Sequence, residues 1–411
     1  MADEATPETR SFIRDRPWLL CCYCPGLPAL HLPGHAELED VTGLLHHHGH
    51  GTLAALLTQP LPEGLTVAAA LDIRYGRHPA LQVRTGAQTR LVGLDGYLQH
   101  STTLTRWLES IRAVTGIQQV ALCLLPQHQT RQPLHTLFPE TAPVLAELPG
   151  HANWSLTNLS GPDFAVLTGI LNALEIAAAL KDARPGGRQG LQLLMAERCL
   201  PHAAETAFQL RTEAEVTASW QQGELAEILL RWLATADQAP RSGLELLRQL
   251  QARGSAPAAR HGFVSSRISQ LHFLCSQFVD RSRQLLNRER PLQAAYLRAR
   301  FNPDDTGNPY RDLFDFMRKI QFQLNLLPVA HTDAGMVVLT ELLDAIHGIL
   351  DLQRNTPEMI VMPEDDADAQ PESLDLPVYM PQSRPVPAYN LLEFSQCGWL
   401  ELVGVLNEAR V

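Results

Sequence analysis

The first residues of this sequence whose types and spacing suggest chemistry are Cys21 and Cys24, which form a C-x-x-C pair. A reactive dithiol of this kind is expected at the N-terminus of a helix, where the helix dipole lowers the pKa of a thiol. Here the pair lies inside the short apolar run Trp18–Cys24, which ends at Pro25 and Gly26. Such a run is typical of a strand buried on both faces. The sequence therefore predicts buried strand cysteines, and exposed thiols that alkylate rapidly would instead indicate a dithiol oxidoreductase.

A second group of chemically capable residues is the histidine cluster His46, His47, His48 and His50. Imidazoles bind transition metals, but neither a carboxylate nor a thiolate is spaced with these four. A zinc site would also need a second pair of cysteines near the first, and the sequence has none. A histidine-rich helix end is the simpler interpretation. We expect no metal and no other cofactor.

Composition narrows the class of protein. The chain has 411 residues, of which 45% are hydrophobic and 19% charged, and this is globular rather than disordered composition. Its net charge of -11 argues against a nucleic-acid partner, because phosphate binding needs clustered Lys and Arg. No apolar stretch approaches the roughly 20 residues that span a membrane. Residues Met1 to Arg16 hold no apolar segment typical of a secretory signal, and the seven cysteines follow no disulfide pattern. These features predict a cytoplasmic protein with no membrane partner.

Short apolar strands alternate with helices along the first half of the chain. The predicted strands are Leu19–Cys24, Val67–Leu71, Val120–Leu125, Ser155–Leu159 and Gln192–Met195. Residues Ala80 to Val92 alternate as a hairpin does, and helices are expected from Ser101 and over Phe164–Leu180. Strands and helices at this spacing predict an α/β fold, with helices on both faces of a mostly parallel central sheet.

The pattern divides the chain into four parts. Residues 1–205 are predicted to form the α/β core and residues 206–362 a mainly helical region, in which about Thr206 to Gly348 read as helices only. Residues 363–373 are acidic and contain proline, which is typical of an exposed linker. Residues 374–411 return to strand and helix, and we expect them to rejoin the core or its edge.

Five segments, in this order, resemble the clostripain family of cysteine peptidases. They are the opening strand and helix Trp18–His48, the helix and strand Leu104–His128, the helix Leu174–Leu180, the motif Tyr310-Arg-Asp-Leu-Phe-Asp-Phe316, and a closing pattern of Leu376–Pro381, Tyr389, Phe394 and Trp399. The fourth is similar to the family's Tyr-x-Asp-Leu-Tyr-Asp-Phe. The resemblance implies a caspase-like three-layer sandwich with an added helical region.

The resemblance also implies a Cys–His dyad at the ends of neighbouring strands. The family's base is the His of a His-Gly pair, whose backbone approaches the substrate closely. Here His128 stands one position late and Gln129 follows it. In such a dyad the imidazole takes the thiol proton, and backbone N–H groups hold the developing oxyanion.

The nucleophile of the family stands in an Asp-Ala-Cys-Leu-Met-Gly motif, and no Cys lies between Cys123 and Cys199. Two alignments are open. If residues 154–160 form the nucleophile strand, Ser160 takes the place of the Cys. If Asp163-Phe-Ala165 is the motif, Ala165 does, as in a natural loss or an engineered inactive form. Both alignments indicate a degenerate site, because a serine hydroxyl needs a better organised base than His128.

Three carboxylates are candidates for a substrate pocket: Asp163, Glu197 and, at its edge, Asp72. In the family, acids in this pocket select Arg or Lys. The sequence thus predicts a clostripain-like pseudopeptidase that binds a protein or peptide partner, possibly a basic one, or regulates a peptidase or defence pathway. The alternative is an active, or engineered inactive, endopeptidase that cleaves after Arg or Lys.

Overall fold

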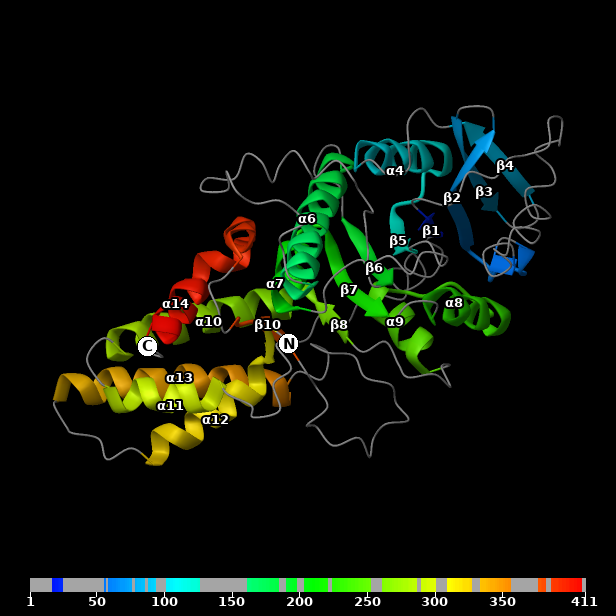
Figure 1. The fold of residues 1–411 in the computed structure, drawn as a ribbon. Helices are drawn as coiled ribbons and strands as arrows, with labels where there is room; N and C mark the ends of the chain where they lie inside the picture. Colours follow the sequence, from blue (N-terminus) through cyan, green and yellow to red (C-terminus); the bar gives the residue numbers. More distant parts are fainter. Residues whose placement is uncertain are drawn as a thin grey trace.

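The structure is a computed structural model in which a sheet-containing half and a helical half lie side by side (Figure 1). It describes residues 17–24, 55–56, 58–75, 78–85, 88–93, 101–125, 161–184, 190–197, 203–220, 224–252, 261–286, 290–300, 309–326, 333–355, 376–381 and 386–408.

A sheet of eight strands organises the first half, in the order β4-β3-β2-β1-β5-β6-β7-β8. Their bounds are β1 Trp18–Cys24, β2 Leu65–Tyr75, β3 His78–Thr85, β4 Gln88–Gly93, β5 Gln119–Leu124, β6 Leu191–Glu197, β7 Ala214–Trp220 and β8 His261–Val264. Strands β2, β1, β5, β6 and β7 run parallel to one another. The hairpin β3–β4 and the strand β8 pair in antiparallel fashion at the two ends.

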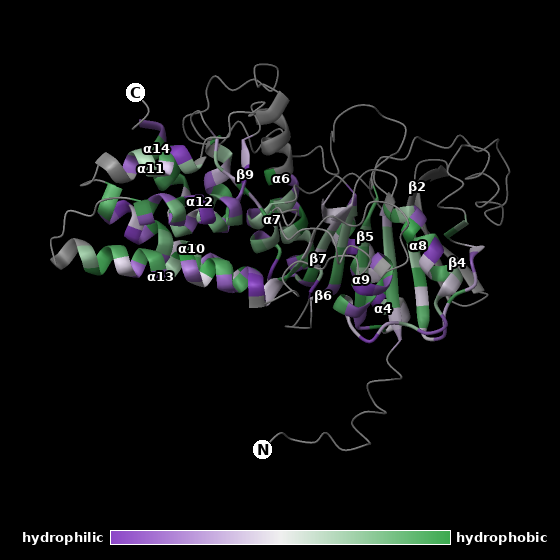
Figure 2. Ribbon diagram, turned by 90° about the horizontal axis from the view of Figure 1, so that it is seen from below, coloured by the Kyte–Doolittle hydropathy of each residue, from purple (hydrophilic) through white to green (hydrophobic). Residues whose placement is uncertain are grey.

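Successive residues of a strand point to opposite faces of the sheet, so both faces of these apolar strands need a cover. Helices supply it on each side. On one face, Tyr23 of β1 packs against Trp107 of α4 (Ser101–Thr115), and α6 (Gly161–Asp182) lies beside α4. On the other face, Trp18 belongs to the core formed with α8 (Glu224–Thr235) and α9 (Gly243–Ala252), around Trp232. The central strands are hydrophobic along most of their length (Figure 2). This is a three-layer α/β fold with a mostly parallel sheet.

The second half is a group of helices around an aromatic core. The helices are α10 Ser265–Leu286, α11 Arg290–Arg300, α12 Leu313–Leu326, α13 Asp333–Asn355 and α14 Trp399–Glu408. Phe278 lies at the centre of the core and contacts the rings of Tyr296, Phe316 and Trp399. The buried hydroxyl of Ser282 lies within this core, and its oxygen is 2.6 Å from the hydroxyl oxygen of Tyr296.

The two halves meet at a short helix and at the last segment of the chain. The helix is α7 (Ala204–Gln209), whose six residues are all buried. Strand β10 (Pro377–Tyr379) pairs with β9 (Tyr310–Asp312), and the 3-10 helices η7 (Pro387–Leu391) and η8 (Glu393–Cys397) lead into α14. Because Ala204 and Phe208 belong to the helical core, α7 ties the end of β6 to the second half.

The predicted strands at Leu19, Val67, Val120 and Gln192 are confirmed as β1, β2, β5 and β6, and the predicted hairpin is β3–β4. The predicted strand Ser155–Leu159 and the linker 363–373 lie outside the described residues. The prediction that residues after 206 are only helical is wrong, because β7 and β8 extend the sheet to Val264. Strand β7 alternates polar Glu215, Thr217 and Ser219 with apolar residues, which is a period-two strand signal that the expectation of helices did not take into account.

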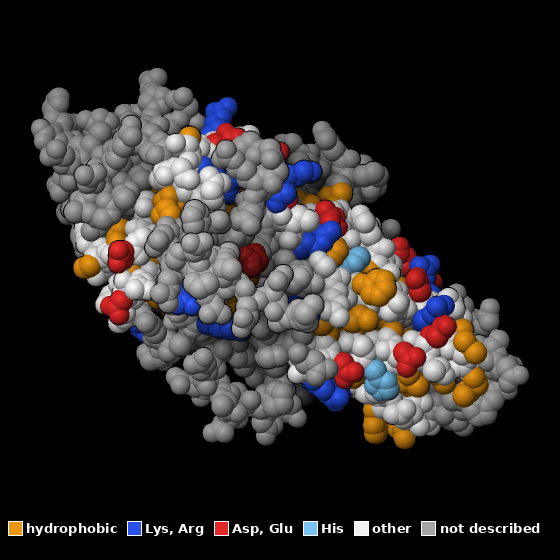
Figure 3. Space-filling view, turned by 180° about the vertical axis from the view of Figure 1, so that it is seen from behind, with side chains coloured by type: hydrophobic (Ala, Val, Ile, Leu, Met, Phe, Trp, Pro, Cys, Tyr) orange, Lys and Arg blue, Asp and Glu red, His pale blue; other side chains and the backbone are white. Residues whose placement is uncertain are grey.

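The C-terminal segment returns to the edge of the core rather than to the large sheet. Strand β10 pairs with β9 only, in a separate two-stranded sheet, and Tyr379 then contacts α7 through its backbone amide. Elsewhere on the surface, acidic and basic side chains are interspersed (Figure 3). Within the described ranges, no helix combines the length and apolar character that a membrane crossing needs.

Candidate functional site

The carboxyl ends of the five parallel strands lie at one edge of the sheet. Strand β1 pairs with β2 on one side and with β5 on the other, so the chain order reverses at β1. In chain order, the five parallel strands take the arrangement 2-1-3-4-5, which is shared by many doubly wound proteins. Ligands in such sheets bind beyond the carboxyl ends, beside the strand at which the order reverses. This edge is therefore the candidate functional site.

Two neighbouring strands deliver chemically capable segments to this edge. Strands β5 and β6 are parallel partners, and Leu124 pairs with Ala196 in their register. In the sequence, His128 follows the end of β5 and Cys199 follows the end of β6 by two positions. His128 and Cys199 themselves lie outside the described residues. The points at which the two segments leave the sheet are nevertheless neighbours.

Of the two positions predicted for the nucleophile, only Ala165 lies among the described residues. Ser160 lies outside the described residues, immediately before α6. Ala165 lies in the first turns of α6, as does Asp163. A residue inside a helix does not end a sheet strand, so the assignment of Asp163-Phe-Ala165 to the strand-end motif is wrong. Helix α6 is instead the crossover that joins β5 to β6.

Glu197, one of the three predicted pocket acids, caps the N-terminus of α8. Its side chain is 0% exposed. Its Oε1 accepts hydrogen bonds from the backbone amides of Leu225 at 2.8 Å and of Ala226 at 3.3 Å. These are amides of the first turn of α8, which no carbonyl of the helix can accept, and a negative charge there is also favoured by the helix dipole. The carboxylate thus links the end of β6 to the layer that covers the sheet, and its role in a substrate pocket stays a prediction.

The other two predicted pocket acids are described only by their backbone. Asp72 lies near the carboxyl end of β2, the strand beside β1, so it belongs to the same edge of the sheet. Asp163 lies at the N-terminal end of α6. Their participation in a pocket stays a prediction.

The C-x-x-C pair is not placed for redox chemistry. Cys21 is buried within β1, and burial raises the pKa of its thiol well above the ordinary range. Its neighbours Cys22 and Cys123 are also buried, and neither forms a disulfide. A thiol with a raised pKa in the centre of a sheet is a poor nucleophile. Within the described ranges, no group of three or more His, Cys, Asp or Glu side chains forms a metal site.

Cys199 is the residue that the sequence reasoning missed. The two alignments considered for the nucleophile, at Ser160 and at Ala165, both lie before it in the sequence. The signal was present: residues Leu191–Cys199 read as a buried strand followed by a cysteine. Strand order was the missing information, because only the pairing of β5 with β6 shows which strand end lies beside the His segment.

Comparison with known proteins gives a likeness to solved structures only. No family model matches the chain. No curated protein matches it either. An inactive zymogen of a C11 protease from Parabacteroides distasonis matches with a TM-score of 0.46 and 11% identity, over 93% of this chain and 97% of that one. A secreted C11 cysteine protease from Bacteroides thetaiotaomicron matches with a TM-score of 0.42 and 10% identity, over 84% and 85%.

The same Bacteroides protease in complex with an irreversible peptide inhibitor matches with a TM-score of 0.41 and 12% identity, over 84% of this chain and 83% of that one. These structural neighbours are C11 proteases, which is the clostripain family that the sequence resembles. With TM-scores below 0.5, the likeness assigns no residue a role. The cytoplasmic location stays a prediction.

Proposed function

We propose that this chain is a cysteine peptidase in which Cys199 is the nucleophile and His128 is the base. The observation that carries the proposal is the register of β5 and β6, in which Leu124 pairs with Ala196. Each residue of an extended chain advances at most about 3.6 Å, so the few residues that follow each strand keep both side chains near the same edge. A thiol and an imidazole delivered side by side by neighbouring strands are what a Cys–His dyad requires.

The residues around Cys199 support this assignment. Glu197-Arg198-Cys199-Leu200 keeps an acid two positions before the cysteine and a leucine directly after it, as in Asp-Ala-Cys-Leu-Met-Gly. The motif also ends a buried sheet strand, unlike the segment at Asp163. Moving the nucleophile to Cys199 removes the main reason for a degenerate site, which was the missing cysteine.

The chemistry of such a dyad follows from the two groups. His128 takes the proton of the Cys199 thiol, and the thiolate attacks the carbonyl carbon of a peptide bond. The C–N bond breaks as the imidazolium gives that proton to the leaving amine. Water, deprotonated by the same imidazole, then hydrolyses the thioester and releases the acid. Backbone N–H groups at the strand ends are the expected donors to the oxyanion.

Two observations favour the pseudopeptidase as the second candidate. No Gly follows His128. The Glu197 carboxylate, which stands where the family has its Asp, is buried and holds the amides of α8. Any preference for Arg or Lys in the substrate, or for a basic peptide as a bound partner, would therefore rest on Asp163 and Asp72.

Peptide hydrolysis by single-residue variants tests the proposal. Fluorogenic peptides with Arg, Lys, Leu or Asp before the labelled bond are incubated with the wild type, Cys199→Ala, His128→Ala and the control Ser160→Ala. We expect Cys199→Ala to lose roughly a thousandfold or more in kcat/KM and Ser160→Ala to keep the wild-type rate.

Labelling of Cys199 by a peptide-directed thiol reagent, located by mass spectrometry, gives an independent readout of the thiolate. A folded wild type that neither cleaves any of the peptides nor labels at Cys199 would leave the pseudopeptidase as the better description. Loss of cleavage on Ser160→Ala, with Cys199→Ala unaffected, would return the nucleophile to the alternative position.

A further inference from the structure

Glu205 on α7 is a buried carboxylate whose environment the C-terminal segment completes. The C-terminal segment is defined here as residues 376–381 and 386–408. Glu205 is 1% exposed, and its Oε1 accepts a hydrogen bond from the backbone amide of Tyr379 at 2.7 Å. Its Oε2 is also buried and has no well-formed hydrogen bond among the described residues, and the same is true of the hydroxyl of Tyr389. The carboxylate is thus only partly satisfied where the segment docks.

The groups that face Glu205 are tyrosines and cysteines. The rings of Tyr379 and Tyr389 stack with their centroids 4.4 Å apart, and Tyr310 packs edge-on against Tyr379. Tyr310, Tyr389, Cys275 and Cys397 all interact electrostatically with Glu205. Burial raises the pKa of each of these four groups, so all are neutral at neutral pH. None of them supplies a positive charge to balance an ionised Glu205.

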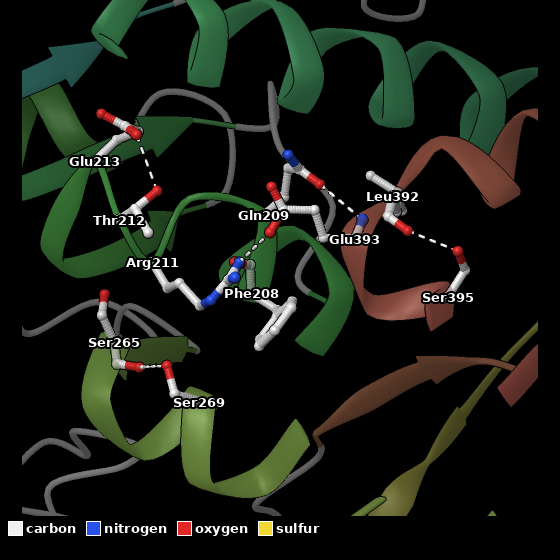
Figure 4. Close-up of polar contacts among 10 residues, drawn as sticks. All are labelled: Phe208, Gln209, Arg211, Thr212, Glu213, Ser265, Ser269, Leu392, Glu393 and Ser395. Atoms are coloured by element: carbon white, nitrogen blue, oxygen red, sulfur yellow. Dashed lines mark hydrogen bonds and ion pairs between the residues drawn. The ribbon is translucent and has the colours of Figure 1, made fainter. Parts of the chain in front are cut away.

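Two further residues of the α7 region hold the same segment (Figure 4). Gln209 Oε1 accepts a hydrogen bond from the amide of Glu393 at 3.0 Å, and Arg211 Nη1 lies 2.7 Å from Glu393 Oε2. The rings of His272, Phe208 and Phe394 also contact one another at this interface. Docking therefore combines these contacts with one buried carboxylate, Glu205.

We propose that Glu205 is a proton-operated latch between α7 and the C-terminal segment. The segment packs tightly while Glu205 is protonated and loosens when Glu205 ionises. The physical reason is that an ionised carboxylate loses its hydration in this site and gains the Tyr379 amide and a contact with the Tyr389 hydroxyl, with no cation among the groups described around it. When the segment moves away, water reaches the carboxylate and the ionised form becomes favourable.

The pH range of the latch follows from the titration of Glu205. Burial raises its pKa from an ordinary value of 4.5 to about 7, against the lowering effect of its contacts with Tyr389 and the Tyr379 amide. The docked state therefore binds more protons than the undocked state between these two values. Its stability is greatest below the ordinary pKa and is lost as pH rises through about 7.

His272 at the same interface acts with the opposite sign. Burial lowers the pKa of its imidazole. The contribution of His272 is therefore present above its ordinary pKa and is lost as pH falls through the lowered value. Of these two groups only Glu205 predicts a loosening as pH rises, and a variant of Glu205 separates its effect from that of His272.

The latch also bears on catalysis, although this part rests on the proposed function. Glu205 follows Cys199 closely in the sequence, and α7 is the first described element after that cysteine. Glu205 is therefore a positioning residue: it would act on the nucleophile through α7 and not by touching substrate. Loosening α7 should lower kcat with little change in KM.

Hydrogen exchange of the full chain tests the latch without reference to activity. Exchange is compared between wild type and Glu205→Gln at the same pH, which cancels the intrinsic pH dependence of exchange. Gln keeps the acceptor for the Tyr379 amide but cannot ionise. We expect the ratio of wild-type to variant protection in residues 376–381 and 386–400 to fall roughly tenfold or more between about pH 5.5 and about pH 8. Residues of β1 and β5 should show a constant ratio.

Controls and a second variant keep the test decisive. Glu215→Gln, at an exposed glutamate of β7, should leave the profile of wild type unchanged. Tyr389→Phe removes a contact that lowers the pKa of Glu205, so the loosening should move to higher pH. A ratio of wild-type to Glu205→Gln protection that does not change with pH would overturn the latch. If Glu205→Gln does not fold, the latch is overturned when Tyr389→Phe loosens the segment at the same pH as wild type. A latch confirmed by exchange in a chain that cleaves no peptide would overturn only the proposed function.

Discussion

The two halves of this molecule are stabilised in different ways. In the sheet half, neighbours in the sheet are joined by parallel pairing, and helices on each face bury alternate residues of the same strand. In the helical half, a single aromatic core around Phe278 collects α10, α11, α12 and α14, and the C-terminal segment is held by side chains that contact backbone amides far away in the sequence.

This difference indicates where each half can tolerate movement. Many equivalent contacts hold the sheet, so we expect its carboxyl edge to move little; in the sequence, His128 and Cys199 follow strands that end at this edge. The helical half depends on a few specific contacts around α7. Three substitutions test this contrast, and each is expected to act mainly on one half.

The largest expected effect is the loss of the aromatic core in Phe278→Ala. Phe278 is 0% exposed and contacts three rings, so truncation leaves a cavity and should lower the free energy of unfolding by about 3–5 kcal/mol. Urea unfolding measures the loss, with Phe322→Ala, at a 61% exposed position of α12, as the matched control. Hydrogen exchange should rise more in α10 and α14 than in β1 and β5. An equal rise in both halves would show a single cooperative unit and contradict the contrast.

A smaller effect is expected when the sheet half loses Glu197. In Glu197→Ala the amides of Leu225 and Ala226 lose their acceptor within a buried site, which should cost about 1–3 kcal/mol. Exchange of the first turn of α8 should rise while the C-terminal segment keeps its protection. Glu227→Ala, at an exposed glutamate of the same helix, is the control and should change stability by less than about 0.5 kcal/mol. An unchanged α8 in Glu197→Ala would remove the capping role and favour a pocket role.

The smallest effect is expected for Glu393→Gln, which removes the ion pair with Arg211. The pair is short, but its side chains are 21% and 45% exposed, so solvent screens it and the loss should stay below about 1 kcal/mol. The backbone amide of Glu393 still donates to Gln209, which keeps the segment docked. Asp315→Asn, which breaks the exposed Lys319 pair of α12, is the control by urea unfolding. A loss as large as that of Phe278→Ala would mean that this ion pair, and not Glu205, holds the segment.

Much of the fold could be predicted from the sequence because its signals are local. The apolar run at Trp18 and the run ending at Leu124 are strands because residues buried on both faces need apolar side chains throughout. The helix over Phe164–Leu180 was likewise visible. Strand β7 was not predicted, although Glu215, Thr217 and Ser219 alternate with apolar residues as in a strand. Its pairing with β6 and β8 shows that this segment belongs to the sheet.

The candidate site was harder to predict because it depends on which strands are neighbours. The sequence placed His128 near a strand end, and this prediction needed only the end of β5. The nucleophile depended on the partner of β5, and sheet order cannot be read from one sequence. The role of Glu197 was hidden for a similar reason: its hydrogen-bond donors belong to a helix that begins well after it along the chain.

The contact between Glu205 and the amide of Tyr379 also has a consequence for synthesis, because it spans 174 residues. A ribosome that adds about 5–20 residues each second needs roughly 10–35 seconds to make the intervening chain. Throughout that time α7 lacks the C-terminal partners that complete its burial, while the strands on either side of it can already pair. A chain interrupted before residue 376 would carry the cysteine and histidine segments without the surface that fixes α7. Arrested chains of increasing length should therefore acquire a protected α7 only after the final strand and helices have emerged.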